Sequence, residues 1–148
     1  MNLPARDQAL QHMVAALRPG AWLLVEDFDL WTWGRTYPPC ELIAQVAKSL
    51  QNVLELGGVD CSYGLKLAPT LAAAGLTNVQ AEGYLPLMQF GTPSIEVPVL
   101  LLEYLRERLI EKGLVTQDDL DRAIATMRQP SSTVCYPPLI VAAWGQKT

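Results

Sequence analysis

The chain has 148 residues, a formal net charge of −4 and an apolar share of 50%. That length suits one domain with a sizeable core, so we expect a single domain over residues 1–148. The acidic balance and the lack of any basic run argue against a nucleic-acid partner. No segment reaches about 18 uninterrupted apolar residues, so no membrane-spanning helix is expected.

The cysteines and the N-terminal segment indicate a cytoplasmic protein. The three cysteines are far apart and form no CxxC pair, and the single histidine, His12, has no neighbour at metal-ligand spacing. We therefore expect reduced thiols and no metal site. The first residues, MNLPARDQ, lack the apolar core of a signal peptide. The high apolar content has two interpretations: a tight core, or an apolar face intended for another chain.

The N-terminal part predicts a helix followed by a buried strand. Leu10, Met13, Val14 and Leu17 have helical spacing, and Pro19 with Gly20 would end that helix. Residues 22–25 are a continuous apolar run, which is typical of a strand covered on both faces in a parallel sheet. Acidic residues follow at the carboxyl end of this strand, where open α/β sheets bind ligands.

The middle of the chain predicts a loop, two helices and a second strand. Residues 31–39 read as a loop that ends in prolines, and residues 41–56 have an apolar face that stops at Gly57 and Gly58. A shorter helix is expected over residues 64–74, with Gly75 as its stop. Residues 78–87 then form a plausible strand.

The C-terminal part predicts two further helices and a last strand. The first helix is expected over residues 95–112, and its apolar stripe comprises Val97, Leu100, Leu101, Tyr104, Leu105 and Leu109. Thr116 suits the N-cap of the next helix, with Asp119 as its capping partner. That helix would turn Leu120, Ile124 and Met127 inward. The last strand is expected over residues 134–144, which gives three strands and about five helices.

Three phrases of the chain resemble one family. LRPGAWLLVEDFD at residues 17–29 resembles the helix and fifth strand of class I S-adenosylmethionine-dependent methyltransferases. YGLKLAPTLAAAGLTNVQAEG at residues 63–83 is similar to the following helix and sixth strand, and PPLIVAAWG at residues 137–145 to the last, antiparallel strand. The resemblance implies an α/β fold that is the C-terminal half of a Rossmann-like methyltransferase. The helices of residues 95–128 would be an insertion before the last strand.

This resemblance also has consequences for cofactor and partners. The family's first four strands and its glycine-rich cofactor loop have no counterpart here. S-adenosylmethionine is therefore expected to bind only if a partner completes the fold, and no cofactor is expected for the isolated chain. By resemblance, the last strand lies between the other two, which leaves the strand of residues 22–28 as an open edge. We expect a homodimer or a complementary N-terminal half-domain chain to cover that edge.

The site residues expected to bind a small-molecule acceptor are Glu26, Asp27, Phe28, Asp29 and Trp31, and no catalytic residue is assigned. The acids have two interpretations, a wall of a substrate pocket or a solvated loop. Trp31, Trp33 and Tyr37 could line an acceptor pocket or cover the core, and packing is the commoner role.

A glycine-containing segment at residues 53–64 superficially resembles the family's cofactor loop. In residues 53–64, Glu55 and Gly57 fit such a loop, but Val59 and Cys61 occupy its later glycine positions. The better match is the family's Asp-x-x-Tyr-Gly segment at Asp60, Tyr63 and Gly64. The sequence thus favours a substrate-side methyltransferase portion, inactive alone. The alternative is a non-catalytic dimerising or ligand-binding module derived from that fold.

Overall fold

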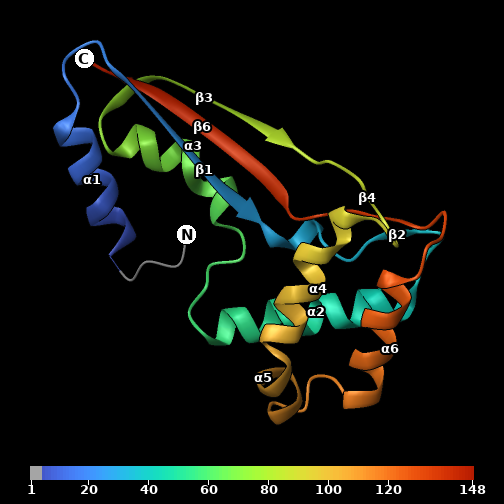
Figure 1. Ribbon diagram of the computed structural model, residues 1–148. Coiled ribbons are helices and arrows are strands. Elements are labelled where there is room, and N and C mark those ends of the chain that lie inside the picture. Colours follow the sequence, from blue (N-terminus) through green and yellow to red (C-terminus); the bar gives the residue numbers. More distant parts are fainter. Residues whose placement is uncertain (1–4) are drawn as a thin grey trace. The chain divides into compact units, whose positions relative to one another are not determined.

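The computed structural model describes residues 5–148 and divides into two compact units (Figure 1). The first unit combines Met1–Leu30, Gly58–Tyr84 and Leu139–Thr148, and the second combines Trp31–Gly57 and Leu85–Pro138. Each unit is therefore assembled from segments far apart in the sequence. The single domain expected over residues 1–148 stays a prediction.

A three-stranded sheet organises the first unit. Its strands are β1 (Trp22–Asp29), β6 (Leu139–Lys147) and β3 (Leu76–Tyr84), in the order β1-β6-β3. The central strand β6 runs antiparallel to both neighbours, with Leu24 opposite Trp144 and Trp144 opposite Gln80. The expectation that the last strand inserts antiparallel between the other two is confirmed. The chain is accordingly a mixed α/β protein.

One face of this sheet is covered by α3 (Tyr63–Ala73), and α1 (Arg6–Ala16) joins the same core. Leu67 and Leu71 on α3 are fully buried among Val141 and Ala143 of β6. On α1, Leu10 and Val14 are buried as the sequence predicts, whereas Met13 is 37% exposed. Helical periodicity thus identifies Leu10 and Val14 as inward positions of α1 and is wrong for Met13.

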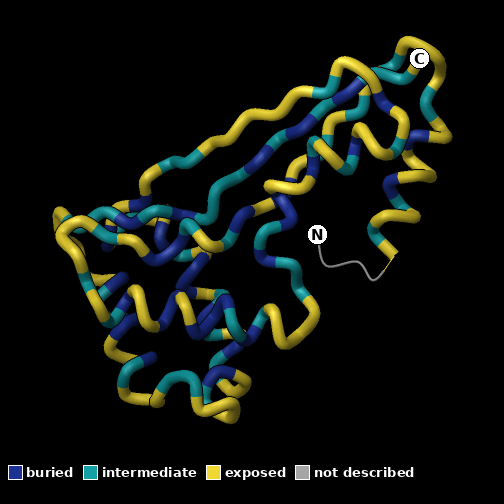
Figure 2. The backbone as a smooth tube through the Cα atoms, turned by 180° about the vertical axis from the view of Figure 1, so that it is seen from behind, coloured by how far each residue is buried: buried dark blue, intermediate teal, exposed yellow. Residues whose placement is uncertain are grey.

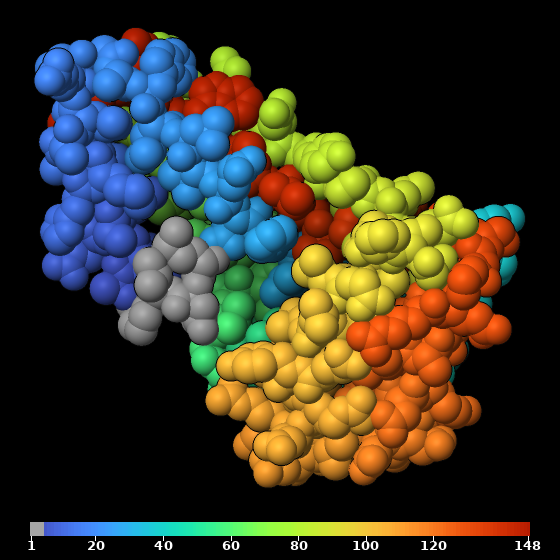
Figure 3. All heavy atoms as spheres, viewed as in Figure 1, coloured from blue at the N-terminus to red at the C-terminus, as the bar shows by residue number. Residues whose placement is uncertain are grey.

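Within residues 5–148, no helix of the first unit covers the opposite face of the sheet, which corrects the expectation that residues 22–25 are covered on both sides. Burial along β1 alternates, and Trp22, Leu24 and Phe28 are 51%, 60% and 48% exposed. Successive side chains of a strand point to opposite faces, and here helices pack against only one of them. In Figure 3, the atoms of β1, β6 and β3 form adjacent bands at the surface of this unit. Figure 2 shows β3 exposed over most of its length.

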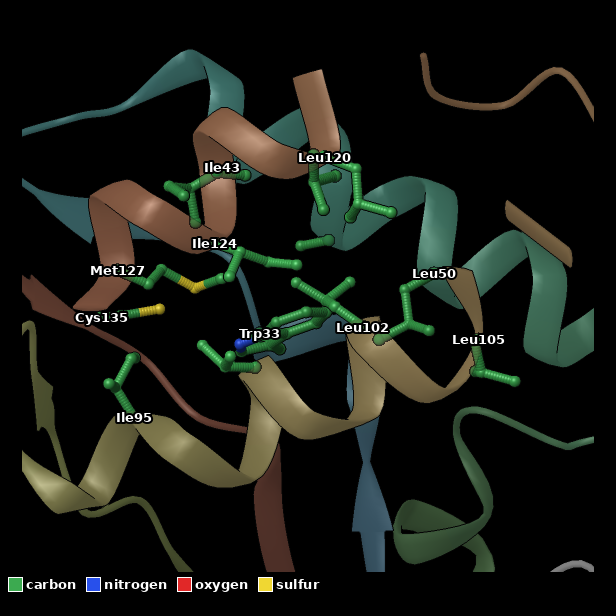
Figure 4. Packing of buried hydrophobic residues seen from close by; sticks show 14 of the residues in the cluster. Trp33, Ile43, Leu50, Ile95, Leu102, Leu105, Leu120, Ile124, Met127 and Cys135 are labelled. Carbon is green, nitrogen blue, oxygen red and sulfur yellow. The ribbon is translucent and has the colours of Figure 1, made fainter. Parts of the chain in front are cut away.

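The second unit packs helices around a core that contains Trp33 (Figure 4). Its helices are α2 (Glu41–Leu56), α4 (Glu96–Tyr104), α5 (Arg106–Glu111) and α6 (Gln117–Arg128). The bounds predicted for α2 are confirmed. Thr116 is the N-cap of α6, where its Oγ1 accepts a hydrogen bond from the Asp119 backbone N–H at 3.1 Å, so this cap is confirmed too.

Short strands and turns complete the second unit. A small antiparallel sheet has the order β2-β5-β4, from β2 (Thr36–Tyr37), β5 (Val134–Cys135) and β4 (Met88–Gln89). The 3-10 turns are η1 (Leu30–Thr32), at the boundary of the units, and η2 (Pro93–Ile95). The segment expected to be a plain loop at residues 31–39 thus carries part of η1 and all of β2.

The helix expected over residues 95–112 differs in two respects. It is broken at Leu105, and its stripe is rotated: Val97, Leu100 and Tyr104 are 74%, 56% and 84% exposed. The buried positions of α4 are instead Pro98, Val99 and Leu102. The segment is apolar on most of its circumference, so spacing alone does not define which face meets the core.

The last strand is also divided. The expected strand of residues 134–144 becomes β5 and β6, which belong to different sheets. Pro137 and Pro138 lie between them and have no backbone N–H to donate to a ladder. None of the helices in residues 5–148 is long and apolar enough to cross a membrane.

Candidate functional site

The carboxyl end of β1 is anchored by the segment that leads into α3. The Leu30 backbone N–H donates a hydrogen bond of 2.8 Å to the Cys61 carbonyl. A Cβ added at Gly64 would lie 2.8 Å from the Phe28 carbonyl carbon and 3.1 Å from the Asp27 carbonyl oxygen. Only glycine fits such a close approach, so Gly64 sets the distance between α3 and β1.

The predicted site residues divide between the two faces of β1. Asp27 and Asp29 lie on the face that α3 covers and are 8% and 6% exposed, whereas Glu26 and Phe28 lie on the uncovered face. Asp27 Oδ1 accepts a hydrogen bond of 2.8 Å from the Phe28 backbone N–H. Trp31 belongs to the second unit and is 45% exposed. The structure therefore brings these residues together as two pairs, and not as one wall.

Sequence reasoning missed a cation cluster around Asp60. Its Oδ2 lies 2.6 Å from Lys66 Nζ and 3.2 Å from Arg6 Nη2. The hydrogen bond from Lys66 is the main reason that the pKa of Asp60 falls to about 2, and burial opposes it. Because Asp60 is ionised and engaged by two cations, it is suited to anchoring the start of α3 and unsuited to accepting a proton.

Tyr63 completes this cluster. The Arg6 guanidinium lies 4.1 Å from the centre of the Tyr63 ring, within the range of a cation–π contact. Burial raises the pKa of Tyr63, so its phenol remains protonated at neutral pH. The matched segment Asp60, Tyr63 and Gly64 thus ties α1, α3 and β1 together, and the sequence signal for it was the Asp-x-x-Tyr-Gly pattern.

The segment of residues 53–64 does not have the form of a glycine-rich cofactor loop. The glycine-containing segment of residues 53–64 begins as the last turn of α2, and Cys61 is fully buried where a cradle needs open backbone. Gly58 has a φ of +84° but has nothing within 4 Å of its Cβ position, so it approaches no other group. In the described residues, no group of His, Cys, Asp and Glu could hold a metal ion.

The aromatic residues of 31–37 take different roles in the second unit. Trp33 is 6% exposed and packs in the core, whereas Tyr37 is 75% exposed. Tyr37 lines a groove of about 490 Å³ together with Arg35, Leu87, Val134 and Tyr136. The sequence analysis did not identify this groove, because the groove depends on the pairing of β2 with β5.

Comparison with known proteins identifies no relative. No family model matches the chain, and no curated protein matches it. The functional proposal therefore rests on topology and site geometry, together with the sequence resemblance. The most specific observation is the strand order of the first unit. Its last strand, β6, lies between β1 and β3 and runs antiparallel to both.

Proposed function

We propose that the chain is the substrate-side, C-terminal portion of a class I S-adenosylmethionine-dependent small-molecule methyltransferase fold, inactive by itself. The strand order β1-β6-β3 carries this proposal, because the resemblance of the three sequence phrases implies that arrangement. The match of Asp60, Tyr63 and Gly64 to the family's segment supports it. Gly64 approaches the backbone of Asp27 and Phe28 at the end of β1, and Asp60 pairs with Lys66 on α3, which gives these two residues of the segment a structural role.

A partner that completes the sheet is part of the proposal. β1 is an edge strand of its sheet, and its uncovered face carries Trp22, Leu24 and Phe28. Large apolar side chains on an unpaired edge favour association. A complementary N-terminal half would add a strand beside β1 and cover Trp22 and Leu24 while leaving Glu26 and Phe28 open at the carboxyl end of the strand, and it would supply the S-adenosylmethionine site.

The chain's own residues would then orient the acceptor. Glu26 and Phe28 have exposed side chains at the carboxyl end of β1, where they are available to a bound molecule. Asp27 acts on the strand itself through its bond to the Phe28 N–H. Methyl transfer in this family depends mainly on placing the reacting groups close and in line, so positioning is the contribution expected of this portion.

Radiolabelled S-adenosylmethionine tests the proposal. The immobilised chain is incubated with an extract of the producing cells, washed, and then exposed to the labelled cofactor. We expect the complex recovered on the wild-type chain to retain the label and the chain alone to retain none. The Leu24→Glu variant should not capture the partner and should therefore retain no label. Leu65→Glu, on α3, is the matched control and should behave as wild type. A complex without retained label would refute completion by a partner.

A non-catalytic dimerising module is the second candidate. The observation that favours it is the same open edge, because a second copy could pair with β1 in place of a complementary half. Calorimetric titration with S-adenosylhomocysteine, with the oligomeric state measured in the same buffer, separates the two. A stable dimer with no binding in any complex supports the module, whereas binding by the dimer itself indicates that two copies build a cofactor site.

A further inference from the structure

The small sheet of the second unit has a core face and an outer face. Cys135 and Met88 are opposite one another and are 1% and 7% exposed, so their face meets the core. Tyr37 lies opposite Val134 on the other face. Because side chains alternate along a strand, Leu87 and Tyr136 are also expected on this outer face.

Arg35 adds a positive charge to the same groove. The Tyr136 backbone N–H donates a hydrogen bond of 2.8 Å to the Arg35 carbonyl, which continues the pairing of β2 with β5. The Arg35 guanidinium lies 5.4 Å from the centre of the Tyr136 ring. That distance is within the range of a cation–π contact, and a guanidinium has five N–H donors, so Arg35 can contact the ring and still donate to a ligand.

No carboxylate neutralises Arg35 within residues 5–148. The groove is lined by Arg35, Thr36, Tyr37, Pro39, Leu87, Val134 and Tyr136, none of them acidic. Glu41 and Arg35 both line the adjacent hollow, but within residues 5–148 no ion pair joins them, and Glu41 Oε1 accepts a hydrogen bond of 3.5 Å from Gln45. The described ion pairs of the second unit involve Arg106, Arg122 and Arg128, each with acidic partners of its own.

We propose that this groove binds a small aromatic carboxylate. Its volume of about 490 Å³ suits a molecule of that size. The Arg35 guanidinium would donate to the carboxylate, and the rings of Tyr37 and Tyr136 with Leu87 would pack against the aromatic body. The inference concerns the second unit alone and does not depend on the proposed methyltransferase relationship.

Charge complementarity distinguishes this occupant from others. A cationic ligand would be repelled by the positive charge of Arg35. A wholly apolar ligand would displace water from the guanidinium and offer it no hydrogen-bond acceptor. An aromatic carboxylate satisfies both parts of the groove. A second copy of the chain or a peptide would instead be revealed by shifts that depend on protein concentration or that extend well beyond the groove.

Titration of the full chain with three matched probes tests the proposal. The probes are 3-phenylpropionate, its neutral counterpart 3-phenyl-1-propanol, and hexanoate, which keeps the carboxylate and lacks the ring. Amide resonances of the groove residues are followed by nuclear magnetic resonance. We expect 3-phenylpropionate to bind more tightly than either counterpart, with shifts centred on Arg35, Tyr37 and Tyr136.

Two variants separate a specific site from general charge attraction. Arg35→Gln should weaken 3-phenylpropionate by about tenfold or more, as expected for loss of a charge-assisted pair. Lys48→Gln removes the same charge from an exposed position on α2 and should leave the affinity unchanged. Tyr37→Ala should weaken 3-phenylpropionate and spare hexanoate. The proposal is overturned if the three probes bind equally, if none binds, or if Arg35→Gln and Lys48→Gln have equal effects.

Discussion

Asp60 shows how one side chain can organise several elements. Its Oδ2 forms salt bridges with Arg6 of α1 and Lys66 of α3. Its Oδ1 accepts hydrogen bonds from the Ser62 backbone N–H at 3.2 Å and from the Ser62 hydroxyl at 3.1 Å. Its side chain is only 19% exposed, so water screens these contacts less than it screens pairs on the open surface. The carboxylate is therefore expected to contribute to stability while it is ionised.

The first prediction concerns the pH dependence of this contribution. The pKa of Asp60 is lowered from 3.8 to about 2, so its stabilisation is complete above about pH 4 and is lost as the pH falls toward 2. Asp60→Asn should reduce the free energy of unfolding by about 1 to 2 kcal/mol at neutral pH. This value is smaller than the pKa shift alone implies, because Lys66 is partly exposed and water screens its contact with Asp60. Denaturation with urea across this pH range should show the difference from wild type shrinking toward pH 2.

Asp121→Asn is the control for that measurement. Asp121 pairs with Arg106 but its side chain is 50% exposed, so its removal should change stability little. If Asp60→Asn and Asp121→Asn have the same small effect at all pH values, the Asp60 cluster is an ordinary surface ion pair and contributes no special stability.

The second prediction concerns Gly64. Gly64→Ala would place its Cβ 2.8 Å from the Phe28 carbonyl carbon, and a backbone neighbour in a paired strand does not move aside. We expect the free energy of unfolding to fall by about 2 kcal/mol or more. Gly57→Ala is the control, because Gly57 has a φ of −82° and its nearest neighbour would be 3.2 Å away. Equal losses in chemical denaturation would contradict the role assigned to Gly64.

At the scale of elements, α4 provides a matched pair of leucines for the third prediction. Leu102 is fully buried and Leu100 is 56% exposed, although both are leucines of the same helix. Leu102→Ala should cost about 2 to 5 kcal/mol of stability, and Leu100→Ala less than about 0.5 kcal/mol. Thermal and urea denaturation measure both. A larger loss of stability for Leu100→Ala than for Leu102→Ala would show that the face predicted from the sequence, and not the face buried in the structure, packs against the core.

Elements with a one-sided pattern were predictable, and those without one were not. Local signals predict both the bounds of α2 and the cap of α6. The apolar face of α2 stops at Gly57 and Gly58, and the Thr116 side chain caps α6. The face of α4 was missed because Val97, Leu100 and Tyr104 mimic a buried stripe. The division of residues 134–144 depends on which sheet each part joins, a non-local property that a single run of apolar residues does not encode.

The candidate site was predicted in position but not in composition. The acids at the end of β1 could be recognised from their place after a strand, yet strand alternation separates Asp27 and Asp29 from Glu26 and Phe28. The cations that engage Asp60 were not recognised because Arg6 is far from it in sequence. The groove at Arg35 and Tyr136 likewise needs the pairing of β2 with β5, which joins residues about a hundred positions apart in the chain.

At the scale of the whole molecule, the first unit has a sheet with helices on only one face. In a three-layer α/β protein, helices cover both faces of the sheet. In the first unit, the described helices cover one face, and Trp22, Leu24 and Phe28 are exposed on the other. Trp144 lies opposite Leu24 on the central strand and extends the apolar surface. This surface adjoins the free edge of β1, so a single partner could pair with the edge and cover the face together.

The pattern of charges on β1 limits how two copies could pair. In an antiparallel pairing centred on Glu26 or Asp27, each acid would face its own copy, which is unfavourable. A pairing centred on Val25 instead sets Trp22 opposite Phe28 and Glu26 opposite Leu24, and one centred on Leu24 sets the two copies of Leu24 together. In both of these registers, a negative charge at residue 24 would face another negative charge.

The last prediction follows from that geometry. In the absence of a complementary chain, we expect the purified protein to self-associate through β1, and Leu24→Glu to shift it toward the monomer. Sedimentation velocity over a range of protein concentrations measures the change. Leu65→Glu is the control, because Leu65 is 59% exposed on α3 and the substitution gives the same net charge. A wild-type monomer at every concentration would show that the edge is not used for pairing. Equal dissociation by both variants would show that net charge, rather than β1, governs association.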